Sequence, residues 1–550
     1  MSTVRGRVSL LVTVALAALV VALPVAAFER AGDRKILVFA GRQEVPTLDP
    51  SVKYDWSIRM MQQALYDALV KYVGNPPEIV PWLAERWESS PDARTWTFHL
   101  VRTARFHTGE PVTAEAVRWS FARTLRLNAG PAWMLSDVLN EDGIRVLDDH
   151  TIQFTLTRPY APFLSFVPWW YVMNPKQVLA QEQGGDLGQK WLTDHEAGSG
   201  PFRIKRWEQG VLYEIEAVDG YWKGWPSKDH VGGVILKIVR EAAAQRAALL
   251  RGEADIVEGL SADDFDQVAK MPGVVVPNYP GMTTFGIKMN TQKGPTKDPN
   301  LRKALAYAFD YEALIKIYNG NAVLQTSPFP NATRGHITVP GFPRQDLARA
   351  KEFLAKSAYP PGGIELEYVY VQGLEEERKL GLVLIDNLAK LGLKVKMVPL
   401  TWPNMVARGA KADTSPDMMA VFTTPVSTDP DAVAYQYHKN SWGKYYGSSF
   451  YANDGVWALI ERARTTARWE ERTPLYAEIQ KKIAASTARW EERTPLYAEI
   501  QKKIAADAPE IFGMLANRRW GMRDYVKGFV FSPVRFTGEV DLYPLAIVTK

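Results

Sequence analysis

The clearest pattern of hydrophobic and polar residues lies between residues 84 and 125. From Trp96 to Leu100 every second residue is aromatic or aliphatic, and threonine or histidine fills the positions between. This is the period of a half-buried strand, and the turn residues Ser90-Pro91-Asp92 before it predict a hairpin over 86–97. After Thr113 hydrophobic residues recur at every fourth position, which predicts a helix capped by the Thr113 hydroxyl.

Strand and helix patterns alternate along the rest of the chain. A buried strand at 234–239 is followed by a helix over 241–251 and a short strand at 254–257. The second half contains a similar pair, a helix over 374–391 followed by a strand at 394–398. Such units build open α/β sheets whose ligands bind in crevices at the strand ends.

The composition indicates a large globular protein. The 550 residues are 46% hydrophobic, which is enough for sizeable cores in two or three lobes. The formal net charge is +5, and removing residues 1–27, which contain Arg5 and Arg7 and no acid, leaves +3. This charge is too small and too scattered to indicate nucleic-acid binding. The 18 Trp and 23 Tyr suit the walls of a small-molecule pocket, although large cores use them equally well.

Residues 1–27 have the pattern of a secretory signal peptide. Two arginines precede the apolar stretch Leu10–Leu23, and Val25-Ala26-Ala27 offers small residues for cleavage. The apolar stretch is also long enough for an uncleaved anchor. The chain contains no cysteine, so it has no disulfide, no thiolate metal site and no attachment point for a diacylglyceryl anchor. Retention of an exported protein without an anchor requires an outer membrane. We therefore expect a periplasmic protein, exported by a cleaved signal peptide, that is not a lipoprotein.

The residues of the hairpin, the next turn and the helix also occur in a recognisable order. The pattern is a Pro-x-Leu-Ala start, a Trp, an Asp turn, an aromatic strand, an Arg, Phe-His-x-Gly and Thr-Ala-Glu. It resembles the signature of the family 5 extracellular solute-binding proteins, the peptide- and nickel-binding subunits of ABC importers. The matching residues are Pro81, Leu83, Ala84, Trp87, Asp92, Trp96, Phe98, Arg102, Phe106, His107, Gly109, Thr113, Ala114 and Glu115. The family usually has Asp after this Glu, whereas this chain has Ala116.

Further motifs extend the resemblance over nearly the whole mature chain. They include Thr47-Leu48-Asp49-Pro50 and Gly198-Ser199-Gly200-Pro201. The resemblance implies an α/β fold of the periplasmic binding protein type, with two lobes, a hinge and an additional subdomain inserted in the first lobe. The expected parts are the core of the first lobe (28–57, 201–283 and 525–550), the inserted subdomain (58–200) and the second lobe (284–524).

The resemblance implies a substrate-binding subunit and not an enzyme. We expect the protein to capture a peptide or peptide-like solute in the periplasm, as a monomer and without a cofactor. It would deliver the solute to the transmembrane subunits of an ABC permease. Ligand in the cleft favours closure of the lobes, which is a population shift that needs no covalent chemistry.

Three aromatic residues are candidates for the ligand site. Tyr54 and Trp56 follow the Asp-Pro motif, and in relatives the residues shortly after this motif often line the site. Trp402 follows the strand at 394–398, near a position where relatives carry a ligand-facing Trp.

Position 426 departs from the family pattern. Peptide-binding members commonly place an Asp about three residues before an Asp-Pro pair, here Asp429-Pro430, to pair with the ligand's α-ammonium, and this chain has Val426. An ammonium buried there without its partner would cost on the order of 2–5 kcal/mol. Either another acid replaces the missing one, Asp429 and Asp431 being nearest, or the ligand is not a free peptide.

Two other functions have to be weighed. Relatives of this fold also bind non-peptide ligands, so a nickel chelate, haem, an opine or a sugar is the main alternative, with His336 and His438 as candidate metal ligands. A secreted hydrolase has less support, because the chain has no Cys, no Gly-x-Ser-x-Gly and no His-Glu-x-x-His. We expect a structural role for His107, which belongs to the Phe-His-x-Gly turn.

Residues 466–485 recur unchanged at 487–506. Repeat folds need several diverged copies, so this tandem duplication indicates a recent in-frame event or an error in the sequence record. Pro495 would interrupt any continuous helix between the copies. We therefore predict two helices, the second docked as the single helix of the family is docked and the first displaced outward.

Overall fold

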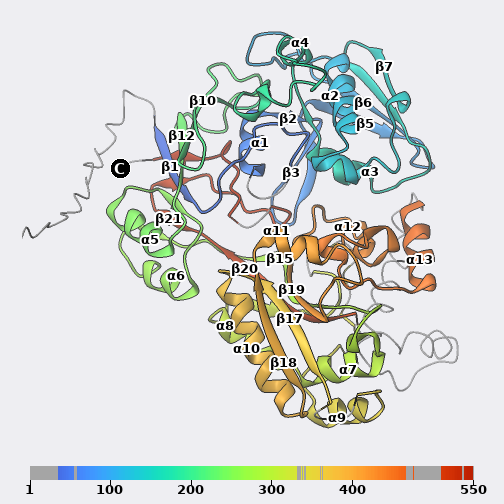
Figure 1. The fold of residues 1–550 in the computed structure, drawn as a ribbon. Coiled ribbons are helices and arrows are strands. Elements are labelled where there is room, and N and C mark those ends of the chain that lie inside the picture. Colours follow the sequence, from blue (N-terminus) through green and yellow to red (C-terminus); the bar gives the residue numbers. More distant parts are fainter. Residues whose placement is uncertain are drawn as a thin grey trace, which may run out of the picture.

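The computed structural model describes residues 35–54, 58–330, 342–359, 363–465, 509–535 and 538–548, with residues 333, 336, 338, 339, 361, 475 and 478 between them. The signal sequence, Trp56 and nearly all of the duplicated segment lie outside these residues, so the predictions made for them are not tested. In the described part of the chain two lobes, each a sheet with helices, lie one above the other in Figure 1. No helix in the described ranges is long and apolar enough to cross a bilayer.

The first lobe is built on a seven-stranded mixed sheet. β1 lies parallel to its two neighbours, and the outer strands are antiparallel. The strand order is β10 (Phe202–Glu208), β11 (Leu212–Ala217), β12 (Gly233–Ile238), β1 (Ile36–Gly41), β13 (Ile256–Val257), β21 (Gly521–Arg523) and β14 (Val274–Val275). The helix predicted over 241–251 is present as α5 (Ala242–Arg251), and it ends where Gly252 adopts the left-handed conformation after the last turn.

A four-stranded antiparallel sheet forms a separate part of the first lobe. Its order is β5 (Ala84–Ser89), β6 (Thr95–Leu100), β8 (Thr151–Thr155) and β7 (Ile144–Asp148). The predicted hairpin is confirmed, since Trp87 pairs with Phe98 across β5 and β6. The predicted cap is also confirmed, because the Thr113 hydroxyl accepts the main-chain N–H of Ala116 at the start of α2 (Ala114–Leu127). Three further pairs of short strands are β2 (Asp67–Ala68) with β9 (Tyr171–Val172), β3 (Val70–Val73) with β4 (Glu78–Pro81), and β22 (Val526–Lys527) with β23 (Ala546–Ile547).

The second lobe is built on a six-stranded sheet. Its order is β16 (Ala322–Leu324), β20 (Glu510–Arg519), β15 (Asn278–Met289), β19 (Met418–Thr423), β17 (Glu365–Val371) and β18 (Lys394–Leu400). The helix predicted over 374–391 is present as α10 (Glu375–Ala389), and the Asp298 carboxylate caps α7 (Pro299–Ala308). The helices of the first lobe are α1 (Arg59–Leu65), α2 (Ala114–Leu127), α3 (Phe163–Phe166), α4 (Pro175–Leu179), α5 (Ala242–Arg251) and α6 (Ala262–Val268). Those of the second lobe are α7 (Pro299–Ala308), α8 (Tyr311–Ile317), α9 (Leu347–Ala355), α10 (Glu375–Ala389), α11 (Trp402–Arg408), α12 (Asp431–Ala434) and α13 (Asp454–Thr465).

Two neighbouring strands connect the lobes. The chain enters the second lobe from β14 into β15 and returns from β20 into β21. The two crossing strands are antiparallel partners, with Asn278 opposite Arg519 and Pro280 opposite Asn517, and the ladder is interrupted between Pro280 and Thr284. β21 pairs with β13 and β14 of the first lobe, so the return crossing comes before residue 521 and not at the expected boundary of 525.

Candidate ligand-binding site

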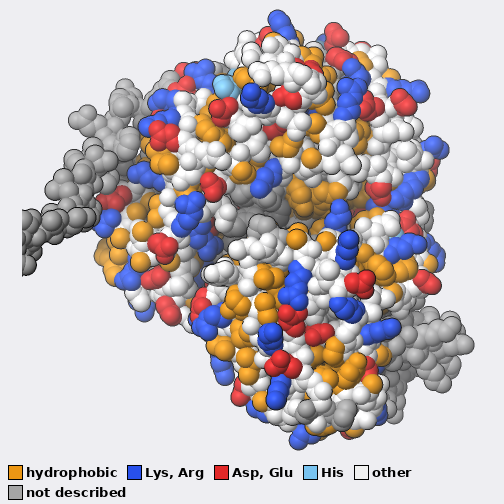
Figure 2. Space-filling model, in the orientation of Figure 1, with side chains coloured by type: hydrophobic (Ala, Val, Ile, Leu, Met, Phe, Trp, Pro, Cys, Tyr) orange, Lys and Arg blue, Asp and Glu red, His pale blue; other side chains and the backbone are white. Residues whose placement is uncertain are grey.

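A cavity of about 40 Å³ lies where the two lobes meet. Figure 2 shows the outer surface hollowed along the same junction. The first lobe contributes Tyr54, Trp133, Met134, Tyr160 and Phe166 to its lining. The second lobe contributes Thr423, Thr424, Pro425, Val426, Asp431, Ala432, Tyr435, Gln436, Tyr446 and Arg464. A molecule in this cavity therefore contacts both lobes, as a ligand that favours their closure must.

The wall from the first lobe is aromatic. Tyr54 lies 5.9 Å from Trp133 and 6.2 Å from Trp169 between ring centroids. Trp133 belongs to a short 3₁₀ turn, η1 (Gly130–Met134), and Trp169 to another, η3 (Val167–Trp169). The guanidinium of Arg59 lies 3.3 Å from the centre of the Trp169 ring. Contact with neighbouring rings and a cation restricts the orientation of these side chains and gives the cavity a rigid apolar wall.

The wall from the second lobe is formed by the end of β19 and the loop that leads into α12. Val426 lies in this loop, lines the cavity and is 6% exposed. Its side chain packs into the hydrophobic core of the first lobe's four-stranded sheet, and its main-chain oxygen accepts the indole N–H of Trp169 at 2.7 Å. Val426 thus packs against the other lobe and carries no charge for a ligand's ammonium.

The two acids considered as replacements differ in position. Asp431 lines the cavity and is 2% exposed, and its Oδ2 accepts the phenolic O–H of Tyr160 at 2.8 Å. Asp429 is also buried, but its Oδ1 accepts the main-chain N–H of Asp431 at 3.0 Å, and it is not among the described residues that line the cavity. The structure therefore favours Asp431 over Asp429 as an acid that a ligand can reach.

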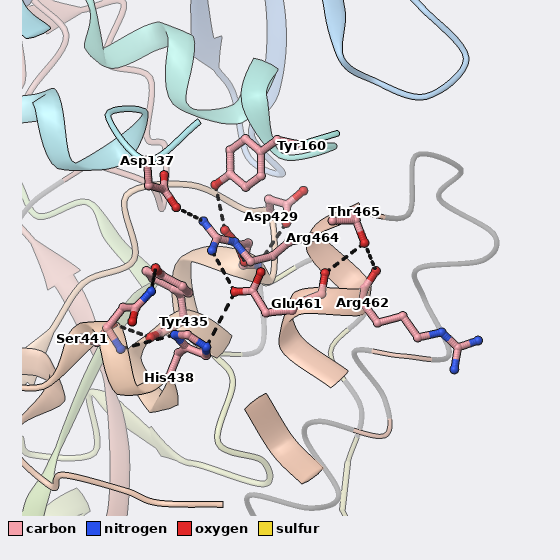
Figure 3. Close-up of polar contacts among 12 residues, drawn as sticks. Asp137, Tyr160, Asp429, Tyr435, His438, Ser441, Glu461, Arg462, Arg464 and Thr465 are labelled. Carbon is pink, nitrogen blue, oxygen red and sulfur yellow. Dashed lines mark hydrogen bonds and ion pairs between the residues drawn. The ribbon is translucent and has the colours of Figure 1, made fainter. Parts of the chain in front are cut away.

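Arg464 is a cavity residue that the sequence analysis missed. It lies near the end of α13, is 2% exposed, and its Nε is 3.3 Å from Oδ1 of Asp431. Figure 3 shows its guanidinium among the side chains of Tyr160, Tyr435 and Glu461. A signal was present in the sequence, because Arg464 falls eight residues after Val456 and four after Ile460, on the apolar face of its helix.

The surroundings of Asp431 fix the protonation states of its two neighbours, Arg464 and Tyr160. Burial lowers the pKa of Arg464, but Asp431 and other nearby anionic groups outweigh burial and raise it above its ordinary value. Burial, together with the Asp431 carboxylate, raises the pKa of Tyr160 well above its ordinary value. The guanidinium therefore stays charged and the phenol stays neutral, so each provides donor hydrogens beside Asp431.

Direct contacts join the lobes around the cavity. In addition to the Trp169–Val426 and Tyr160–Asp431 hydrogen bonds, the main-chain N–H of Ala161 donates to the main-chain oxygen of Arg464 at 3.0 Å. These contacts join the two lobes directly, so cavity-lining residues of each lobe are held by residues of the other.

Two other predicted site residues stand apart from this group. Trp402 begins α11, is 45% exposed and is not among the described residues that line the cavity. It follows β18 as the sequence predicts, but the first turn of α11 leaves its ring close to half exposed. Trp56 lies outside the described residues, so its place near Tyr54 stays a prediction.

The histidines that were weighed for chemistry have protein partners. His107 lies between Glu196, whose Oε1 is 2.7 Å from its Nδ1, and the main-chain oxygen of Gly200, 2.9 Å from its Nε2, which fits the expected structural role. His336 contacts Thr326 and the main-chain oxygen of Phe329. His438 Nε2 lies 3.7 Å from Glu461. Among the described residues, no group of three or more His, Cys, Asp or Glu is placed to hold a metal ion.

Comparison with known proteins shows the family. Residues 78–445 match the bacterial extracellular solute-binding proteins, family 5, middle region. The probable D,D-dipeptide-binding periplasmic protein DdpA of Escherichia coli K12 is 29% identical over 509 residues, which cover 91% of this chain and 92% of that protein. The dipeptide-binding protein of the same organism is 26% identical over 445 residues, 76% of this chain and 81% of that protein.

A solved structure shows the same fold. It is the ABC transporter-associated periplasmic binding protein DppA of Helicobacter pylori in complex with the peptide STSA, with a TM-score of 0.78 at 24% identity, covering 94% of this chain and 99% of that one. This likeness confirms the predicted two-lobed α/β fold. The chain belongs to the family 5 bacterial extracellular solute-binding proteins, the solute-binding subunits of ABC importers.

Proposed function

We propose that this protein is the periplasmic receptor for a short peptide, or a peptide-like solute, with a free ammonium group. The observation that carries the proposal is the cavity between the lobes, which has an aromatic wall and a buried carboxylate, Asp431. The names of the two E. coli relatives support a dipeptide as the ligand class. Binding is non-covalent, and the permease recognises the closed form of a monomer.

Asp431 receives the ammonium in this proposal. Its Oδ2 already accepts a hydrogen bond from Tyr160, and a carboxylate has room for further donors at its two oxygens. A charge-assisted hydrogen bond of this kind contributes about 1.5–3 kcal/mol. Tyr54, Trp133 and Trp402 would provide apolar contacts for the side chains of the ligand, the last of them at the surface, and Trp56 is expected beside Tyr54.

The proposed location follows from the first residues of the chain. Cleavage after residue 27 would release the protein into the periplasm, and the lack of cysteine leaves no site for a diacylglyceryl anchor. Mass spectrometry of the exported protein tests both points, because an uncleaved or lipidated chain has a different mass.

The test of ligand class starts with the mature protein purified without refolding. Mass spectrometry after denaturation would identify whatever small molecule it carries, and calorimetry would compare D-alanyl-D-alanine, L-alanyl-L-alanine and their N-acetyl derivatives. We expect a free dipeptide to bind, and acetylation, which removes the ammonium charge, to weaken binding at least tenfold. Asp431→Asn should weaken binding of the free dipeptide by about the same factor, whereas the matched variant Asp429→Asn should have a smaller effect.

A non-peptide solute is the second candidate. The apolar Val426 at the position of the usual acid, with the aromatic rings around it, favours a ligand without an ammonium. A single co-purified compound such as an opine, a sugar, a haem or a metal chelate, with no binding of either dipeptide, would overturn the peptide proposal in favour of this one.

A further inference from the structure

Arg464 contacts three carboxylates at once. Its Nε lies 3.3 Å from Asp431, its Nη1 3.2 Å from Glu461 and its Nη2 3.2 Å from Asp137. The guanidinium also lies 4.0 Å from the ring centre of Tyr435. Figure 3 shows these side chains together. A planar guanidinium carries five donor hydrogens in a rigid fork and can face acceptors on several sides at once, whereas a lysine ammonium is a compact point charge with three donors.

The three carboxylates belong to different parts of the molecule. Asp431 and Glu461 are in the second lobe with Arg464, and Asp431 lines the cavity. Asp137 follows η1 in the first lobe, and it is not among the described residues that line the cavity. Arg464 is therefore in contact with the acid of the ligand site on one side and with an acid of the opposite lobe on the other.

A second arginine connects the same groups across the junction. Arg158 of the first lobe lies 3.0 Å from Asp137 and 3.4 Å from Glu461. The network thus contains two guanidinium groups and three carboxylates, which gives it one negative charge in excess. A cation from a ligand would neutralise this excess, and the cavity offers Asp431 as the point of contact.

We propose that Arg464 and Asp137 are positioning residues that couple ligand binding to closure of the lobes. A cationic group bound at Asp431 competes with Arg464 for that carboxylate, so the guanidinium interacts more strongly with Asp137 in the opposite lobe. The ligand then strengthens an ion pair between the lobes that it does not itself touch. The identity of the cationic ligand rests on the proposed function, whereas the role of the Arg464–Asp137 pair in closure does not.

The test replaces the acid outside the cavity. Asp137→Asn removes one charge from a side chain that is 36% exposed, so the fold should tolerate it. The matched control is Glu141→Gln, which removes a carboxylate of 34% exposure from a pair with Arg126 inside the first lobe. Because the chain has no native cysteine, Leu147→Cys in the first lobe and Leu382→Cys in the second can carry two spin labels at exposed positions.

Pulsed electron resonance then measures the distance between the lobes, and calorimetry measures the affinity for D-alanyl-D-alanine. Without dipeptide, we expect Asp137→Asn to show longer distances between the lobes than the wild type. With dipeptide, the distances should shorten less than in the wild type. The Kd for the dipeptide should rise about fivefold, which is the effect of losing a partly exposed ion pair. Glu141→Gln should match the wild type in all three measurements. Arg464→Lys, which keeps the charge and loses the three-way contact, should resemble Asp137→Asn and add little to it in the double variant.

The outcomes separate this inference from the proposed function. If Asp137→Asn matches the wild type in distances and in Kd, the coupling is wrong even though the dipeptide binds. If the wild type binds neither dipeptide, the peptide proposal fails, and only the distances measured without dipeptide test the role of the Arg464–Asp137 pair in closure. Longer distances in Asp137→Asn than in the wild type support that role. Unchanged distances overturn it.

Discussion

The hydrogen bond from Trp169 to the main chain of Val426 offers a direct test of how the lobes are held together. Trp169→Phe removes the indole N–H but keeps an aromatic ring next to the Arg59 guanidinium. In the closed arrangement the Val426 oxygen would lose its donor at 2.7 Å in a buried place. In an open arrangement water can replace that donor, so the change weakens the closed form selectively.

The size of the effect follows from the burial of the carbonyl. A buried acceptor left without its donor costs about 1–3 kcal/mol. A change of about 2 kcal/mol alters the ratio of open to closed protein by about thirtyfold. Because closure is part of the binding reaction, the Kd for the dipeptide should rise by up to the same factor.

The neighbouring Trp170 provides a matched control. It is 1% exposed, its ring lies 4.9 Å from that of Phe121, and its indole nitrogen has no hydrogen-bond partner among the described residues. Trp170→Phe removes the same atoms from the same core but breaks no contact between the lobes. It should lower the free energy of unfolding of the first lobe without changing closure.

Spin labels at positions 147 and 382, together with calorimetry, would compare the two variants with the wild type. We expect longer distances and weaker dipeptide binding in Trp169→Phe only. If Trp169→Phe closes and binds as the wild type does, the hydrogen bond to Val426 does not contribute to closure. If both variants open equally, the effect belongs to the packing of the aromatic core and the reasoning from the hydrogen bond is refuted.

Two further predictions concern stability and pH. Burial lowers the pKa of His107, but the neighbouring Glu196 outweighs burial and raises it. The pair should therefore stabilise the fold fully below about pH 6.5 and lose this effect as the pH rises through the folded-state pKa of His107. Urea unfolding at several pH values should show that the free energy of unfolding depends less on pH in Glu196→Gln than in the wild type. Burial raises the pKa of Glu377 from 4.5 to about 8. The contribution of the neutral Glu377 side chain to stability is therefore full below pH 4.5 and lost by about pH 8. Glu377→Gln, which stays neutral, should raise the free energy of unfolding above pH 8 by up to about 5 kcal/mol. An equal pH profile in variant and wild type would contradict either prediction.

Local chemistry explains the elements that could be predicted from the sequence. The Thr113 cap, the hairpin over 86–97 and the helix over 241–251 depend on residues close together in the chain, so their spacing is enough to place them. The return crossing of the chain was misplaced by a few residues, because β21 has only three residues and its pairing with β13 and β14 depends on distant strands.

The candidate site was predicted only in part, for a similar reason. Tyr54, Val426 and Asp431 line the cavity, and each follows or belongs to a motif that the sequence shows, while their role in ligand binding stays a prediction. Tyr160 and Arg464 could not be assigned from motifs, since they lie far apart in the chain and belong to different lobes. Trp402 was placed correctly in the chain, just after a strand, but it is not among the described residues that line the cavity. The exposure of its ring depends on the first turn of α11, which the sequence pattern does not specify.

The paired strands between the lobes have a mechanical consequence. Two separate linkers would allow the lobes to slide and to twist independently, whereas β15 and β20 are joined by a ladder that resists sliding along the strand direction. The ladder is interrupted between Pro280 and Thr284, and bending should concentrate in this short stretch. The relative motion of the lobes is then close to rotation about one axis. A permease that grips the two outer ends would apply a torque about that axis, and a small force at a long distance from it would be enough to separate the walls of the cavity.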